Sequence, residues 1–182
     1  MQIQAKPIRV WDLPTRIFHW SLAASFVIAF ITAESEKLRD IHVLAGYGMA
    51  GLIAFRILWG FVGGTHARFA DFLPTPGKLV HYLKSLLAGR PQHYVGHNPA
   101  GAVAIFLLLA FGLIAAASGY ATYNEFGGHF MEEVHEAAAN GMMAVVAIHI
   151  VGVIVSSWLH GENLVKAMIT GWKKIRNENP AG

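Results

Sequence analysis

Four histidines lie in strongly apolar stretches, where a titratable ring is rarely without a function. His135 and His149 stand at the two ends of "HEAAANGMMAVVAIH", and His19 and His42 each lie in an apolar stretch of their own. In a helix, fourteen residues bring His149 to within about 40° of the face of His135 and about 21 Å further along the axis. Two opposed neutral imidazoles are ligands that a six-coordinate haem iron requires. The residue types and spacing therefore predict haem chemistry.

The elements that position these histidines are four apolar segments. The chain has 182 residues, of which 54% are hydrophobic and 14% charged, with a mean hydropathy of +0.44. A bilayer core requires roughly 20 apolar residues of helix. We therefore predict an all-α integral membrane four-helix bundle, with residues 1–182 as one domain, in preference to a soluble all-α bundle. The predicted spanning helices cover residues 14–33, 40–62, 99–121 and 134–159.

Two more helices are predicted at the membrane surface, over residues 76–88 and 163–176. In the first, apolar side chains such as Leu79 and Leu83 share one helical face, and lysines lie largely elsewhere. This pattern is typical of a helix that lies along the interface. The first apolar run lacks a small-residue cleavage site, so we expect a retained first helix.

The net charge of the segments between the helices predicts their orientation. Residues 1–16 carry +2, residues 56–98 carry +4 and residues 160–182 carry +2, whereas residues 34–40 carry −1 and residues 120–136 carry −4. Segments rich in lysine and arginine stay in the cytoplasm. We therefore expect both termini and the long middle loop to be cytoplasmic. This asymmetry explains the pI near 9.3 without nucleic-acid binding.

Depth in this topology predicts how the histidines pair. His42 begins the second helix at the periplasmic side, level with His135. His19 lies near the cytoplasmic start of the first helix, closer to the level of His149. We expect one pair in each leaflet, each able to hold one haem. Ordinary hydrogen bonding to a neighbouring helix is the simpler alternative, and a haem-free transporter or scaffold with a histidine proton relay stays open.

Other metal chemistry fits less well. The sequence "HEAAA" is not H-E-x-x-H, because Ala139 occupies the second ligand position. The absence of cysteine excludes disulfides, thiolate metal sites and cysteine-ligated iron–sulfur clusters within the chain. His160 would lie about 37 Å from His135, beyond the hydrocarbon core, so we interpret it as interfacial. Arg56 ends the second span and either pairs with a haem propionate or extends to lipid headgroups.

Five motifs resemble those of the bacterial cytochrome b561 family: "PTRIFHW", "LRDIHVLAGYGM", "RILWGFVG", "GHNPAG" and "HEAAANGMMAVVAIH". That family includes the cytochrome b subunits of nickel–iron hydrogenases and is similar to the formate dehydrogenase gamma subunit. The resemblance covers nearly the whole chain. It implies two haems b per chain, with one iron ligand from each of the first two helices and two from the fourth. This agrees with the pairs His19/His149 and His42/His135.

The resemblance also implies a function. We expect electron transfer between the membrane quinone pool and a periplasmic redox protein, either a c-type cytochrome or a hydrogenase, and assign no catalytic residue. A stand-alone superoxide:quinone oxidoreductase is the first alternative, because the short loop 34–40 leaves little surface for a large partner. The cytochrome b subunit of a nickel–iron hydrogenase is the second. A homodimer is compatible with the sequence.

Two surfaces follow from this expectation. The acidic segment 120–136 should dock a positively charged partner. The quinone should bind at the cytoplasmic side near the His19/His149 haem, where His97 and Asn98 enter the third helix. Asn98 is also a natural N-cap before Pro99. At an unperturbed pKa of about 6.5, His97 would be suited to relay protons.

Overall fold

The computed structural model describes residues 7–90 and 92–174. Its frame is four long helices, each long and apolar enough to cross a membrane. They are α1 (Leu13–Thr32), α2 (Arg39–Val62), α5 (Pro99–Tyr123) and α6 (Gly128–His160). Within the described residues, the predicted all-α fold with four membrane-spanning helices is confirmed.

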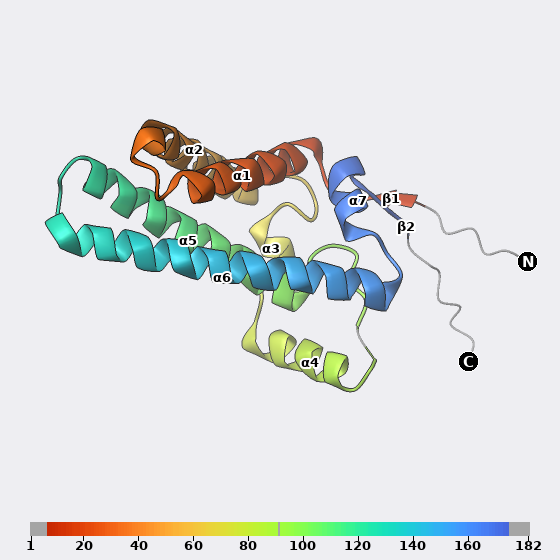
Figure 1. Cartoon of the computed structure of the whole chain (residues 1–182). Coiled ribbons are helices and arrows are strands. Elements are labelled where there is room, and N and C mark those ends of the chain that lie inside the picture. The colour runs from red at the N-terminus through yellow and green to blue at the C-terminus, as the bar shows by residue number, and fades with distance from the viewer. Residues whose placement is uncertain (1–6, 91, 175–182) are drawn as a thin grey trace, which may run out of the picture.

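The four helices form two antiparallel hairpins (Figure 1). The short 3-10 helix η1 (Glu36–Leu38) joins α1 to α2, and residues 124–127 join α5 to α6. The hairpins contact each other mainly through α2 and α5. Gly112 makes this contact close, because a Cβ atom there would lie 2.6 Å from Cδ1 of the fully buried Ile53.

Side-chain caps fix where two of the spanning helices begin. Asp12 accepts a hydrogen bond from the Thr15 N–H at 2.8 Å before α1, and Asn98 accepts one from the Gly101 N–H at 2.7 Å before α5. A proline lies within the first two positions of each helix, where its missing N–H leaves no bond unmade. The caps thus set the depth at which each helix carries its side chains.

The start of α6 differs from the prediction. It begins at Gly128, not near residue 134. Gly128, His129, Glu132 and Glu133 interrupt the apolar pattern in this stretch, so that pattern could not reveal the added turns. His129 contacts Glu132 at 3.1 Å and Glu133 at 3.4 Å, one turn further along the helix, and such contacts support an exposed helix start.

The segment between the hairpins contains α3 (Phe69–Phe72) and α4 (Pro76–Leu87). α4 occupies the region predicted as helix 76–88, and its Tyr82 is buried against Tyr94. Leu87 on the same helix is 90% exposed. The location of α4 in the membrane interface stays a prediction.

The predicted helix 163–176 is wrong beyond its first half. α7 spans only Leu164–Thr170 and ends at Gly171, which has a φ of 87°. The chain then forms β2 (Trp172–Lys174), which pairs antiparallel with β1 (Pro7–Arg9). The Gly171 carbonyl accepts a hydrogen bond from Val10 N at 2.8 Å, which stops the helix and starts the strand pair. Residues 175 and 176 of the predicted helix lie outside the described residues.

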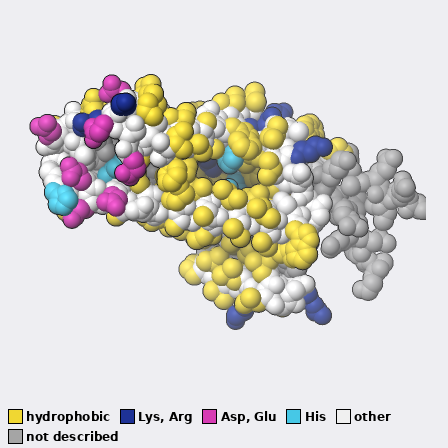
Figure 2. Space-filling view, in the orientation of Figure 1, with side chains coloured by type: hydrophobic (Ala, Val, Ile, Leu, Met, Phe, Trp, Pro, Cys, Tyr) yellow, Lys and Arg dark blue, Asp and Glu magenta, His cyan; other side chains and the backbone are white. Residues whose placement is uncertain are grey.

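Charge separates along the bundle (Figure 2). Acidic side chains gather at the end where both hairpins turn, around residues 34–40 and 124–136, and we call this the acidic end. The strand pair, α3, α4 and α7 lie towards the other end, which we call the basic end (Figure 1). The structure thus keeps apart the segments whose net charges differ in sign.

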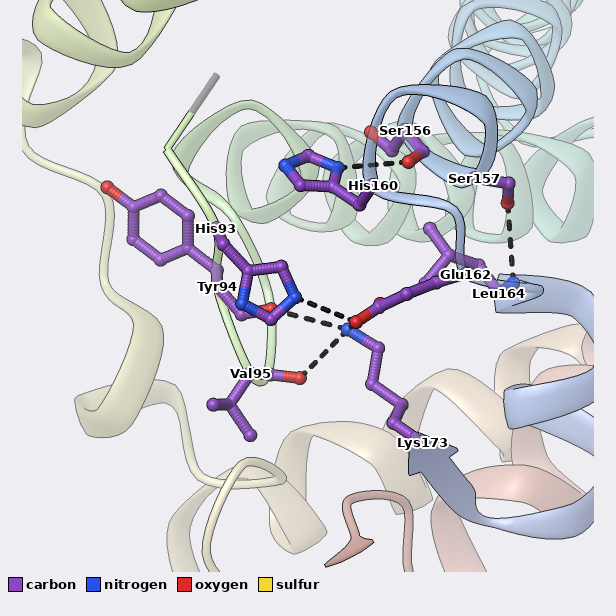
Figure 3. Close-up of polar contacts among 9 residues, drawn as sticks. All are labelled: His93, Tyr94, Val95, Ser156, Ser157, His160, Glu162, Leu164 and Lys173. Atoms are coloured by element: carbon purple, nitrogen blue, oxygen red, sulfur yellow. Dashed lines mark hydrogen bonds and ion pairs between the residues drawn. The ribbon is translucent and has the colours of Figure 1, made fainter. Parts of the chain in front are cut away.

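A buried ion pair ties the basic end together (Figure 3). Lys173 Nζ lies 2.9 Å from Glu162 Oε2 and donates to the carbonyls of Tyr94 and Val95 at 3.3 and 3.1 Å. Glu162 Oε1 lies 2.7 Å from His93 Nε2. The pair therefore connects β2 to the loop that leads into α5, and we call these contacts the clasp.

Replacing Lys173 by Met should lower the thermal stability of the protein in detergent. The Lys173 and Glu162 side chains are only 4% and 10% exposed, and removing one partner of a buried pair costs about 3–5 kcal/mol. Circular dichroism during heating measures the loss. Adding Glu162→Gln to Lys173→Met should recover part of it. If Lys173→Met alone melts at the same temperature as the native protein, the clasp contributes no stability.

The clasp should also weaken in acid. Burial alone raises the pKa of Glu162, but its bonds to Lys173 and His93 outweigh burial and hold this pKa below its usual 4.5. A carboxyl whose pKa is lowered by folding stabilises the protein above its unfolded pKa and loses that effect as pH falls through the folded value. The stability difference between native and Lys173→Met protein should therefore be complete at neutral pH and shrink below about pH 4.5. A difference that stays constant into that range would contradict this linkage.

Candidate functional site

Two pairs of histidines face each other across the two hairpins. His42 on α2 faces His135 on α6, with 6.1 Å between ring centroids and an interplanar angle of 79°. His19 on α1 faces His149, also on α6, at 6.4 Å and 52°. These are the two pairs expected from depth, the first towards the acidic end and the second towards the basic end. Their role as iron ligands stays a prediction.

The spacing of each pair fits one metal ion between the rings. A first-row metal binds an imidazole nitrogen at about 2.0 Å, and the ring centroid lies about 1.1 Å behind it, so opposed ligands have centroids about 6.2 Å apart. Both observed separations agree with this value.

The composition of the pairs points to haem iron rather than a bare ion. Among the described residues, no group of three or more His, Cys, Asp or Glu side chains could hold a metal ion. A structural zinc site requires four protein ligands. An iron that already has four ligands from a porphyrin requires only two more, and a histidine pair supplies two.

Hydrogen bonds orient both rings of the acidic-end pair. His42 Nδ1 lies 2.9 Å from the carbonyl of Ala29 on α1, and His135 Nδ1 lies 2.8 Å from the carbonyl of Ala115 on α5. A carbonyl only accepts, so each Nδ1 carries the proton and each Nε2 keeps a free lone pair. Each ring is thus fixed by the other helix of its own hairpin and presents Nε2 for coordination.

The basic-end pair is less constrained. His19 Nδ1 is buried without a hydrogen-bond partner among the described residues. The ring instead packs edge-on against Trp20, at 5.0 Å between centroids. The two pairs therefore differ in the support that the protein gives to their rings.

A cavity of about 330 Å³ surrounds the acidic-end pair. This volume lies in the range of about 300–1,000 Å³ that is typical of cofactor sites. Small residues keep it open: a Cβ atom on Gly119 would lie 2.9 Å from His135 Cε1, and Gly46 faces open space. Ala115 and Ala116 also line it. The cavity therefore leaves room for a flat group beside His135.

Arg56 is buried near the basic end. It is 3% exposed, and its guanidinium carbon lies 4.7 Å from the ring centroid of Phe69 and 5.9 Å from that of Phe72. The expectation that Arg56 could extend to lipid headgroups is therefore wrong, because α3 covers the side chain. Its Nη1 is buried and lacks a hydrogen-bond partner among the described residues.

His97 and Asn98 lie in the loop before α5. The Asn98 side-chain oxygen accepts the capping hydrogen bond of α5, and its amide nitrogen is the group that can donate to a ligand. His97 packs between Trp11 and Phe72, with centroids at 4.6 and 4.3 Å. Burial and the nearby Arg56 guanidinium lower the pKa of His97 to about 3. This lowered pKa keeps the ring neutral at physiological pH and argues against the expected proton relay at a pKa of about 6.5.

Some site residues were not predicted. The carbonyls of Ala29 and Ala115 leave no signal in a sequence, because every residue has one. Ser118 and Gly119 do leave a signal in the sequence, because two small residues follow each other at the level where His135 crosses α5. Ser118 Oγ lies 3.5 Å from His135 Nδ1. His160 belongs to neither pair, and its ring faces His93 at 5.3 Å (Figure 3).

Comparison with known proteins gives a family. A family model described as prokaryotic cytochrome b561 matches residues 10–171. A probable Ni/Fe-hydrogenase B-type cytochrome subunit of Bradyrhizobium diazoefficiens is 27% identical over an alignment of 218 residues, which covers 93% of this chain and 87% of that protein. A protein of the same description from Azotobacter vinelandii is 25% identical, with 95% and 91% covered.

A probable Ni/Fe-hydrogenase 1 B-type cytochrome subunit of Escherichia coli is 27% identical over 64% of this chain and 60% of its own length. No solved structure matches. The matched span 10–171 contains both histidine pairs and all four long helices. The resemblance seen in the motifs is thus confirmed, and the chain belongs to the prokaryotic cytochrome b561 family as a multi-pass membrane cytochrome that carries haem b and transfers electrons.

Proposed function

We propose that this chain holds two haems b and carries electrons across the bacterial inner membrane between the quinone pool and a redox partner. His42 and His135 would hold one haem iron at the acidic end, and His19 and His149 would hold a second haem iron at the basic end. The observation that carries the proposal is the opposition of both imidazole pairs at 6.1 and 6.4 Å. When bound, haem supplies a one-electron iron couple.

The protein's own residues orient the ligands. Donation from Nδ1 to the Ala29 and Ala115 carbonyls holds the acidic-end rings in one tautomer and makes Nε2 a better donor to a metal. The two ligands on α6 belong to one rigid helix, so their fourteen-residue spacing sets the separation of the two sites at about 21 Å.

The orientation follows the charge of the segments. The segments at the basic end are rich in lysine and arginine, and such segments stay in the cytoplasm during insertion. The acidic end is then periplasmic. Under this proposal the His42/His135 site serves a periplasmic partner, and the His19/His149 site serves the quinone.

The partner that we propose is a positively charged redox protein, either a c-type cytochrome or a hydrogenase. The curated relatives above are named as hydrogenase cytochrome subunits, which supports the second of these. Their alignment of 218 residues exceeds the 182 residues of this chain, so those relatives contain insertions that it lacks. A hydrogenase would therefore have to dock on a smaller surface here.

Charge at the cavity argues against the stand-alone superoxide:quinone activity. Glu34 and Glu36 line the cavity beside His42, and Arg39 is the cation that lines it with them. Superoxide is an anion and is repelled by a net negative entrance. Rapid haem reduction after a pulse of superoxide would nonetheless favour that activity over a protein partner.

Removing the ligands one at a time should separate the two haems. Replacing His42 or His135 by Ala should abolish the acidic-end haem, and replacing His19 or His149 should abolish the basic-end haem, leaving about half the native haem in each case because each iron loses one of two protein ligands. The pyridine haemochrome assay on purified protein measures this. His160→Ala is the control and should keep both haems. Loss of a haem from the control, with His149→Ala unaffected, would contradict the assignment.

Gly119→Ala should weaken haem binding at the acidic end only. The added Cβ would lie 2.9 Å from Cε1 and 3.0 Å from Nδ1 of His135, so the ring must move. Overpacking of this kind costs about 1–3 kcal/mol, which corresponds to a loss of about 5- to 150-fold in affinity. Gly51→Ala, where a Cβ meets nothing within 4 Å, is the matched control. Equal haem content in both variants would show that Gly119 does not shape the site.

Docking at the acidic end should depend on salt. Glu132 and Glu133 have side chains 61% and 64% exposed, and attraction between such charges and a basic protein is screened over about 8 Å at physiological ionic strength. With a basic c-type cytochrome as the probe, Glu132→Gln with Glu133→Gln should slow association several-fold without changing either haem spectrum. The control variant Asp71→Asn, which removes an acidic charge near the basic end, should not slow association. Association that accelerates with added salt would contradict this docking surface.

The quinone site that we propose is the loop at His97 and Asn98. The Asn98 amide nitrogen is the group that can donate to a quinone carbonyl, since the cap uses the oxygen. Asn98→Asp keeps a capping oxygen but loses the amide donor, so it should slow quinol-driven haem reduction about tenfold while dithionite reduction stays normal. His97→Ala should also slow it. Native quinol kinetics in Asn98→Asp and His97→Ala would exclude this loop as the site.

A further inference from the structure

Arg56 carries a buried positive charge that lies within electrostatic reach of Asp12 but is not in direct contact with any described carboxylate. It is 3% exposed, and no described carboxylate forms an ion pair with it. The oxygens of Asp12, the acid that caps α1, bind Thr15 N and Trp59 Nε1 instead. Burying a charge is strongly unfavourable unless it is paired. The unpartnered Nη1 is therefore a donor that requires an anion.

His97 provides a second unsatisfied donor beside Phe72, an aromatic ring that also lies near Arg56. Its ring lies 4.3 Å from Phe72, and the Arg56 guanidinium carbon lies 5.9 Å from that same ring. His97 Nδ1 is buried and has no hydrogen-bond partner among the described residues. Because the ring is neutral, it adds a donor to this place without adding a second charge. His97 also lies within electrostatic reach of His149.

We infer that Arg56 and His97 form a carboxylate clamp that holds a propionate of the haem at the His19/His149 site. The inference rests on the proposed function, in which that pair holds a haem. A carboxylate neutralises the guanidinium and has enough lone pairs for both Arg56 Nη1 and His97 Nδ1. Donation from Nδ1 leaves the Nε2 lone pair of His97 free. Haem b carries carboxylates at one edge, so the clamp also fixes which edge faces the basic end.

The first test removes the charge. Arg56→Gln should weaken haem binding at the basic-end site about tenfold or lower the midpoint potential of that haem, because a cation beside the haem favours its reduced form. Arg56→Lys keeps the charge and should restore the potential in part. Arg68→Gln, at an exposed arginine paired with Asp71 at 3.1 Å, is the control and should change neither value. His97→Ala should shift the potential less, since it removes a neutral donor.

The second test changes the ligand and does not depend on the stability of a variant. Haem-free protein is loaded with haem or with haem dimethyl ester, which lacks free carboxylates. The native protein should bind the ester at the basic-end site about tenfold less tightly than haem, and Arg56→Gln should not distinguish the two. Equal binding of haem and ester by native protein, with unchanged potentials in Arg56→Gln, would overturn the clamp. Failure to bind haem at all would instead overturn the proposed function.

Discussion

Under the proposed function, the structure depends on one constraint: two imidazole rings from different helical hairpins must face each other across an iron, and their centroids lie about 6 Å apart. A hydrogen bond tolerates a range of rotations, but a shared metal ion requires both rings to point at one position. The hairpins contact each other mainly through α2 and α5. Both histidine pairs nevertheless join the first hairpin to α6. Haem binding would therefore hold together helices that otherwise share little contact.

The spacing on α6 extends this constraint along the membrane normal. Because the helix is rigid, His135 and His149 fix two depths at once, and His42 and His19 must match them. The cap at Asp12 sets where α1 begins, and the short turn at η1 sets where α2 begins. Local hydrogen bonds at the helix ends thus determine whether histidines in the membrane meet.

Much of this could be predicted from the sequence, because helix geometry relates residue number to depth. The four spans and the meeting of the two histidine pairs follow from apolar length, the positive-inside rule and a rise of about 1.5 Å per residue. The short strand pair could not be predicted, since three-residue strands show no periodicity and the partners lie at opposite ends of the chain. The burial of Arg56 and His97 depends on Phe69, Phe72 and Trp11, which reach them only through tertiary packing. The same packing lowers the pKa of His97.

The most direct measurement of the central claim is the haem content of the purified native protein together with its near-infrared magnetic circular dichroism. We expect two haems b per chain and, in the oxidised protein, low-spin iron whose charge-transfer band reports two imidazole ligands at both sites. A single haem per chain, or a second haem with high-spin iron or a non-histidine ligand, would contradict it.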